Sequence, residues 1–139
     1  MAMVTSVTRV QQMLLARMDE VLAPFDLTFA RYELLMLLSF TRTGALPLGK
    51  VGERLQVHPT SVTSAVGRLE AQGLVVRKPH PTDGRATLVE ITPDGRNVVE
   101  KATREVNEQV FTQLPLAPAE VEQVTTLLER FRRNAGDIE

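Results

Sequence analysis

Apolar residues recur every three or four positions near both ends of the chain, in residues 5–23 and 118–135. The first set comprises Val7, Val10, Leu14, Met18, Val21 and Leu22, and the second comprises Val121, Val124, Leu127, Leu128 and Phe131. This spacing predicts two amphipathic helices, because it places the apolar side chains on one face of each. Pro24 is expected to end the first helix, and Pro118 to begin the second, where a proline costs no hydrogen bond. Both apolar faces need another surface to cover them.

The segment from Phe29 to Phe40 is apolar on nearly all sides, with the sequence FARYELLMLLSF. Such a pattern is typical of a helix that is buried in the centre of a domain. Thr28 precedes the segment and is expected to cap the helix, since its hydroxyl can accept a hydrogen bond from an amide of the first turn. We therefore expect this helix to form the middle of the fold.

Two further helices separated by a tight turn follow this segment. The first is expected over Leu48–Leu55, which has apolar residues one helical turn apart. The second is expected to begin at Pro59, after His58 as its N-cap. The buried stripe of this second helix comprises Val62, Val66 and Leu69. Gly73 is expected in the left-handed conformation that ends many helices.

A β-hairpin is predicted after the second helix of this pair. Residues 74–79 (LVVRKP) favour a strand, and residues 87–91 (TLVEI) alternate between the two sides of a second strand. The sequence between them, from His80 to Arg85, is rich in turn-forming residues. A hairpin that follows a helix–turn–helix is the layout of a winged DNA-binding unit.

A long helix is expected from residue 93 to about residue 113, because Thr92 and Pro93 repeat the cap-and-proline start. The whole pattern predicts a single domain over residues 1–139 that is mostly α with a small β-wing. Its winged helix-turn-helix would span about residues 28–92, between the helices at the two ends of the chain.

The exposed side of the helix that begins at Pro59 carries small residues where a solvated helix usually carries Glu and Lys. These residues are Thr60, Ser61, Thr63, Ser64, Gly67 and Arg68. Small side chains let a helix enter the major groove of DNA, and hydroxyls can bond to phosphates or base edges. An ordinary core helix with a Ser/Thr-rich outer face is the alternative, and this face alone does not separate the two.

The predicted hairpin carries Arg85 at its tip, from which an arginine can reach a narrow minor groove of DNA. Asp83 would repel DNA, so we expect it to orient Arg85 through a charge-assisted hydrogen bond. A solvated hairpin with an incidental ion pair is the alternative. The hairpin shifts the balance toward DNA binding.

Composition and charge narrow the class of protein further. A net charge of −1 argues against a general polyanion binder but not against specific DNA binding. Acids predominate in the flanks, whereas cations gather in the central unit: Arg68, Arg77, Lys78, Arg85 and Arg96. The absence of cysteine excludes disulfides, thiolate zinc sites and cysteine redox switches. No secretory signal or membrane-spanning run is visible, so we expect a cytoplasmic protein that does not enter a membrane.

The sequence GALPLGKV, residues 44–51, resembles a phosphate-binding loop but lacks two of its requirements. Val51 stands where Ser or Thr would hold magnesium, and Pro47 removes an amide donor from the loop. The chain also shows no nucleophile–base pair and no metal-ligand cluster. We therefore expect no cofactor, no metal, no catalytic residue and no enzymatic activity.

The chain resembles the MarR (multiple antibiotic resistance regulator) family of winged helix-turn-helix transcription factors. The resemblance lies in LTFARYELLMLL and in LPLGKVGERLQVHPTSVTSAVGRLEAQGLVVRKPHPTDGRATLVEITPDGR. Its most specific marks are Arg77, the motif Asp83-x-Arg85 and the motif Thr92-Pro93-x-Gly95. It implies a homodimer, joined through the helices at the two ends of the chain, that binds a pseudo-palindromic operator in double-stranded DNA. It further implies a transcriptional regulator, with a repressor relieved by a small ligand as the expected form.

The resemblance also implies which residues form the binding sites. Those expected to bind DNA are Pro59, Thr60, Ser61, Thr63, Ser64, Arg68, Arg77, Asp83 and Arg85. Relatives often bind a small aromatic or phenolic acid between the dimer helices and the DNA-binding lobe, where Arg31, Tyr32 and Met36 fall. Many relatives carry Arg at the position of Ser64, so the operator sequence does not follow from the resemblance. A winged-helix module that binds a protein instead of DNA is the alternative function.

Overall fold

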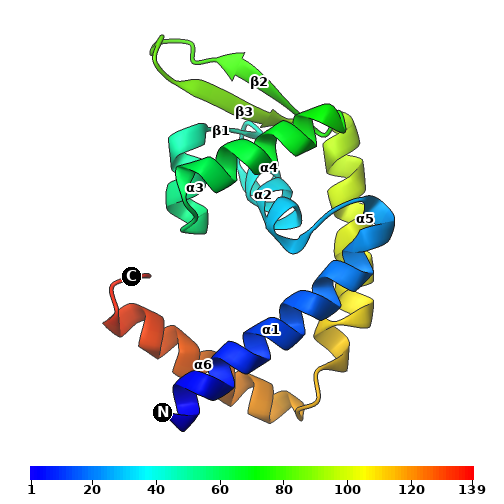
Figure 1. Cartoon of the computed structure of the whole chain (residues 1–139), viewed down its shortest axis with the longest axis vertical. Coiled ribbons are helices and arrows are strands. Elements are labelled where there is room, and N and C mark those ends of the chain that lie inside the picture. The colour runs from blue at the N-terminus through cyan, green and yellow to red at the C-terminus, as the bar shows by residue number, and fades with distance from the viewer.

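The computed structural model describes the whole chain, Met1 to Glu139, and is mostly helical (Figure 1). Its elements are α1 (Ala2–Leu22), α2 (Phe29–Phe40), β1 (Ala45–Pro47), α3 (Leu48–Leu55), α4 (Pro59–Ala71), β2 (Val75–Pro79), β3 (Thr87–Ile91), α5 (Pro93–Gln109) and α6 (Pro118–Asn134). Short 3-10 turns follow α1 and α5, at Ala23–Phe25 and Phe111–Gln113. The long helix α5 thus ends four residues before the predicted limit, and the last part of the predicted segment is one of these turns.

Three antiparallel strands form the sheet, in the order β1–β3–β2. The sequence pattern predicts only the hairpin β2–β3, in which Val75 lies opposite Ile91. It does not reveal β1, because three residues that include a proline carry no alternating pattern. β1 pairs with the other edge of β3, with Leu46 opposite Val89, and so places the start of α3 beside the hairpin.

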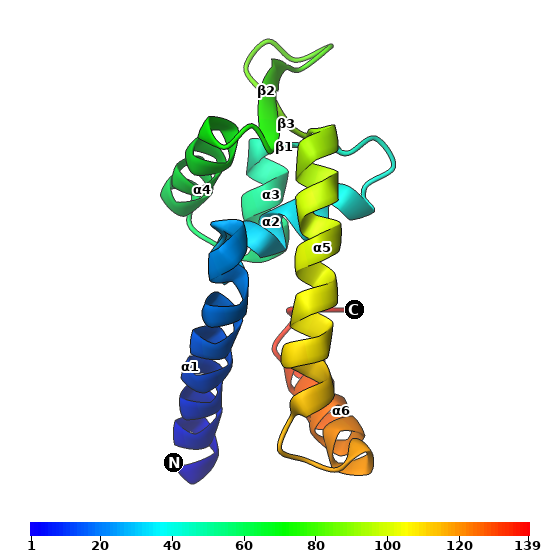
Figure 2. The ribbon, with the colours of Figure 1, turned by 90° about the vertical axis from the view of Figure 1, so that its right-hand side faces the viewer.

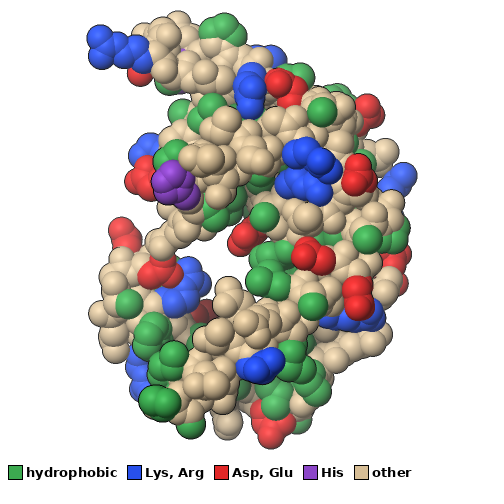
Figure 3. Space-filling view, viewed as in Figure 1, with side chains coloured by type: hydrophobic (Ala, Val, Ile, Leu, Met, Phe, Trp, Pro, Cys, Tyr) green, Lys and Arg blue, Asp and Glu red, His purple; other side chains and the backbone are tan.

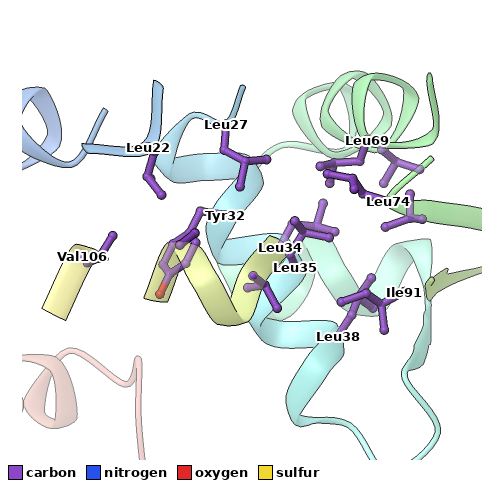
Figure 4. Packing of buried hydrophobic residues seen from close by; sticks show 14 of the residues in the cluster. Leu22, Leu27, Tyr32, Leu34, Leu35, Leu38, Leu69, Leu74, Ile91 and Val106 are labelled. Atoms are coloured by element: carbon purple, nitrogen blue, oxygen red, sulfur yellow. The ribbon is translucent and has the colours of Figure 1, made fainter. Parts of the chain in front are cut away.

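The core lies between α2, α3, α4 and the sheet, and extends along α5 to the last turns of α1 (Figure 4). As the sequence predicts, α2 is the central helix. Side chains with no more than 1% of their surface exposed come from every layer: Leu34, Leu35, Leu38, Val51, Val66, Leu69, Val75 and Val89. The elements from α2 to β3, residues 28–91, are called the winged lobe below.

The helices α2 and α4 begin with the caps that the sequence predicts. The Thr28 hydroxyl accepts a hydrogen bond from the Arg31 amide at 3.4 Å. His58 Nδ1 accepts one from the Thr60 amide at 3.1 Å, and Pro59 occupies the first helical position. Both caps satisfy an amide that the helix itself leaves without a partner.

The start of α5 is tied to the turn after α4. The Thr92 hydroxyl donates to the Gly73 carbonyl oxygen at 2.7 Å and accepts from the Gly95 amide at 3.0 Å. Gly73 has a φ of +73°, the left-handed conformation expected of it. A Cβ atom on Gly95 would lie 2.2 Å from the Leu74 carbonyl oxygen. The close approach of these two backbones therefore requires glycine in the Thr-Pro-x-Gly motif.

Below the winged lobe, the last turns of α1, with Met18, Val21 and Leu22 buried, pack against α5, and α6 lies at the far end of α5 (Figure 2). No residue of α6 is buried within the protomer. An apolar groove between α1 and α6 is lined by Met3, Val4, Val7, Thr8, Val124, Leu127, Leu128 and Phe131. None of the helices has both the length and the apolar character to cross a bilayer.

Candidate nucleic-acid interface

The outer face of α4 carries four exposed hydroxyl side chains: Thr60, Ser61, Thr63 and Ser64. The Thr63 hydroxyl donates to the Pro59 carbonyl oxygen at 3.0 Å, within the helix. The other three hydroxyls make no hydrogen bond within the chain. Because the opposite face of α4 is anchored in the core, these three hydroxyls are held outward and are free to bind another molecule.

Two arginines lie beside the three free hydroxyls. Arg68 of α4 is exposed and forms no ion pair, and it lines a shallow groove together with the hydroxyls and Arg31 of α2. The Arg31 guanidinium is fixed there, because it donates to the Asp26 carbonyl oxygen at 3.2 Å and to the Gln72 side-chain oxygen at 3.4 Å. Arginines and hydroxyls of this kind are the usual partners of phosphate oxygens.

A third arginine, Arg77 of β2, is bound by an acid of α4. The Glu70 carboxylate accepts a hydrogen bond from the Arg77 amide at 3.1 Å, and its second oxygen lies 3.7 Å from Arg77 Nη1. Arg77 Nη2 also donates to the Thr63 carbonyl oxygen at 3.5 Å. These contacts tie the wing to α4 and partly neutralise Arg77. The sequence indicates Arg77 but not Glu70, since only the fold brings the two together.

The tip of the wing is ordered by two side chains that bind main-chain amides. Asp83 Oδ1 accepts from the Arg85 amide at 3.0 Å, and His80 Nδ1 accepts from the amides of Thr82 and Asp83 at 3.2 and 3.0 Å. Asp83 therefore holds Arg85 by its backbone, and no ion pair joins their side chains. The Arg85 side chain is exposed and lines a shallow groove with the start of α3. The contribution of His80 is not evident from the sequence.

The three residues expected to form an effector site do not line one cavity. Tyr32 is buried, and its hydroxyl lies 2.9 Å from Thr103 Oγ1 of α5. The same Thr103 hydroxyl lies 3.3 Å from the sulfur of Met36. Arg31 instead lines the groove on α4. Tyr32 and Met36 thus belong to the packed contact between α2 and α5, and only Arg31 faces an open groove.

The class of protein follows from this arrangement. Helices α3 and α4 and their short turn form a helix–turn–helix, and the hairpin β2–β3 forms a wing next to it. The outer helix presents free hydroxyls and arginine to solvent. This is a winged helix-turn-helix protein of the DNA-binding type.

Comparison with known proteins agrees with this class. Residues 25–86 match the family model described as MarR family. The structure of Sco5413, a MarR family transcriptional regulator from Streptomyces coelicolor, superposes with a TM-score of 0.92 and 47% identity, covering 99% of this chain and 96% of that one. A MarR variant from E. coli in complex with operator DNA gives 0.87 and 25%, over 94% of both chains. The repressor IacR from Pseudomonas putida is 30% identical over 115 residues, 81% of this chain and 66% of its own.

The chain belongs to the MarR family of transcriptional regulators, and the curated relatives it matches are regulators of transcription. It spans 54%, 64% and 57% of the lengths of three further curated relatives. All three are helix-turn-helix transcriptional regulators.

Proposed function

We propose that this protein is a repressor that binds a pseudo-palindromic operator as a homodimer and is released by a small aromatic or phenolic acid. In this proposal α4 enters the major groove and the wing lies along the adjacent minor groove. The observation that carries the proposal is the outer face of α4, where three exposed hydroxyls without partners lie beside Arg68. A face with these groups has no role in the packing of the protomer.

The proposed DNA contacts divide into two kinds. Thr60, Ser61, Thr63 and Ser64, with Pro59, would approach base edges, and Arg68, Arg77, Asp83 and Arg85 would form or support the phosphate and minor-groove contacts. Arg68 and Arg85 form no ion pair, so their full charge is available to DNA. Arg77 is shared with Glu70 and would contribute less.

The groove between α1 and α6 supports the homodimer. Phe131 and Leu127 have 61% and 54% of their surface exposed in the protomer, and Met13 of α1 has 63% exposed. Apolar side chains of this size concentrated on two helices are typical of an interface. A second copy of the same helices would cover them, because a two-fold interface pairs one patch with itself.

The effector part of the proposal rests on Arg31 and not on Tyr32 or Met36. A carboxylate in the groove on α4 would pair with Arg31 and Arg68 and compete with DNA phosphate for the same cations. 4-Hydroxybenzoate is a suitable probe: it should reduce operator binding by the parent protein, and less so by Arg31→Gln. Equal release from both proteins would remove Arg31 from the proposed site.

The test of DNA binding uses an operator selected by the protein from genomic DNA. Arg85→Ala should weaken binding about tenfold or more for all sequences and lower the slope of log affinity against log salt, by about 0.9 for each phosphate that the protein no longer neutralises. Thr60→Ala or Ser64→Ala should instead change the preferred bases. Arg130→Ala on α6, an exposed arginine without an ion pair, is the matched control. The absence of any selected duplex at low salt would favour a protein-binding module in place of DNA binding.

A further inference from the structure

The chain turns back toward the winged lobe after α6. Gly136 has a φ of +76°, and the amides of Gly136 and Asp137 donate to the carbonyl oxygens of Arg133 and Arg132 at 3.0 and 2.9 Å. This is the usual way in which a glycine closes a helix and reverses the chain. As a result, the end of the chain lies close to α3 (Figure 1).

Asp137 joins two separate parts of the molecule through its carboxylate. Its Oδ1 accepts a hydrogen bond from the side-chain amide of Gln56 at 2.5 Å, and its Oδ2 accepts one from Arg132 Nε at 2.5 Å. Only 26% of the Asp137 side chain is exposed. Both oxygens are thus used, one to hold α6 and one to hold the winged lobe.

Gln56 lies in the turn of the helix–turn–helix. It ends α3 with a φ of +54°, the left-handed conformation that is unfavourable for a residue with a side chain. Two residues later, His58 caps α4. Only Val57 separates Gln56 from the cap of α4, so a hydrogen bond to Gln56 holds the chain close to the start of the helix that carries the exposed hydroxyls.

Little else connects α6 with the winged lobe. Between the tail and α3 lies a hollow of about 820 Å³ that is lined mostly by charged residues, among them Glu33, Lys50, Arg54 and Arg132. Figure 3 shows the opening through the middle of the protomer. Since apolar packing does not fill this space, the distance across it depends on the few polar contacts that span it.

We propose that Asp137 is a positioning residue for DNA binding, which fixes the turn between α3 and α4 relative to α6. The inference rests on the proposed function, in which α6 belongs to the dimer interface and α4 enters DNA. In such a dimer, the link from α6 to Gln56 is present twice, and it restricts the separation of the two α4 helices. Binding to two half-sites requires that separation to match the DNA, which advances about one turn in 10 base pairs.

The first test measures the separation directly. The chain has no cysteine, so Ala71→Cys, at the exposed end of α4, accepts a single spin label in each protomer. Pulsed electron–electron double resonance on the free dimer measures the distance between the two labels. The distance distribution should be narrow in the parent and clearly broader with Asp137→Ala or Gln56→Ala. Glu129→Ala removes the same charge from an exposed position of α6 and should leave the distribution narrow.

The second test measures the consequence for DNA. The operator selected by the parent protein is altered by inserting or deleting one base pair between its half-sites. The parent should prefer one spacing, and Asp137→Ala should lower that preference about tenfold, because each protomer loses both hydrogen bonds of the Asp137 carboxylate, including the one to Gln56. Asp137→Asn has one side-chain oxygen, so it can accept from Gln56 but not from Arg132 at the same time, and it should retain part of the preference.

The outcomes separate this inference from the proposed function. If Asp137→Ala matches Glu129→Ala in both the distance distribution and the spacing preference, the inference is wrong while the proposed function stands. If no distance between two labels is detected in the parent, the protein is not a dimer. If the parent also binds no duplex, the proposed function fails and the inference fails with it. A broader distribution together with a weaker spacing preference supports both.

Discussion

The winged lobe and the helices at the two ends of the chain are stabilised in different ways. The lobe encloses its own core, in which Leu35 and Leu38 have no exposed surface. Helix α6 has no buried residue, and Phe131 on its apolar face is 61% exposed. The same kind of sequence pattern, an apolar stripe, thus lies in a buried core in the winged lobe and on an exposed surface in α6. The difference indicates that the lobe can fold within one protomer, whereas the apolar face of α6 is left for another surface to cover, which in the proposed function is a second copy.

The largest effect that separates the two regions is expected from Phe131→Ala. Truncation of a central aromatic residue costs about 2 kcal/mol of association, and a two-fold interface loses it twice, so dimer affinity should fall about a thousandfold. Sedimentation at several concentrations measures this loss. The unfolding midpoint of the variant should also depend on concentration more visibly than that of the parent. An unchanged dimer would mean that α6 is covered by something other than a second copy.

Leu35→Ala tests the other side of the comparison. Removal of a fully buried leucine side chain should lower the free energy of unfolding by about 3 kcal/mol. The loss has two parts: the hydrophobic free energy of the removed atoms, and the cost of the cavity that they leave behind. Denaturant unfolding at two protein concentrations measures it. The loss should be the same at both, since Leu35 lies in the core of one protomer. A loss that grows on dilution would contradict an independently stable lobe.

Gly95→Ala is expected to have the next largest effect, at the junction of the lobe with α5. The added Cβ would meet the Leu74 carbonyl oxygen and the Ile91 side chain, at 2.2 and 2.8 Å, so the two backbones must move apart. We expect a loss of about 2 kcal/mol in the free energy of unfolding, measured by denaturant unfolding. Gly49→Ala is the matched control in α3: its Cβ would meet nothing within 4 Å. That change should stabilise the protein slightly.

The smallest predicted effect concerns Glu33, which lines the charged hollow beneath the tail. Partial burial raises the pKa of the Glu33 carboxyl above its usual value. Its ionisation therefore opposes folding, and stability is lost as the pH rises through the raised pKa. Glu33→Gln should thus be slightly more stable than the parent at neutral pH, and the difference should vanish in acid, where the parent carboxyl is protonated in both states. Thermal unfolding from acid to neutral pH measures it, with Glu129→Gln as control.

Most of the fold could be predicted from the sequence because its signals are local. The caps at Thr28 and His58, the glycine stop at Gly73 and the stripe of α4 each depend on residues within one or two turns. Such local signals do not predict the strand β1, since it forms only through its pairing with β3. The candidate DNA-binding side chains could be named for the same local reason, although their roles in binding stay predictions.

The contacts that join distant segments could not be predicted. Glu70 lies against Arg77, Arg31 lies with Arg68 and apart from Met36, and Asp137 reaches Gln56 across 81 positions. No periodicity or motif marks these pairs, because each depends on how the helices pack. The separation of Arg31 from Tyr32 and Met36 changed the proposed effector site for this reason.

The sequence by itself determined the class of the protein: hydrophobic periodicity, caps and turn residues define the helix–turn–helix and the wing, and the hairpin together with the small polar face of α4 predicts DNA binding. The tertiary structure alone decided which charges are free, which are neutralised, and how the winged lobe is held relative to α6. The physical reason is that secondary structure arises from interactions a few residues apart, whereas ion pairs and the spacing between lobes arise from segments that meet only after the chain has folded.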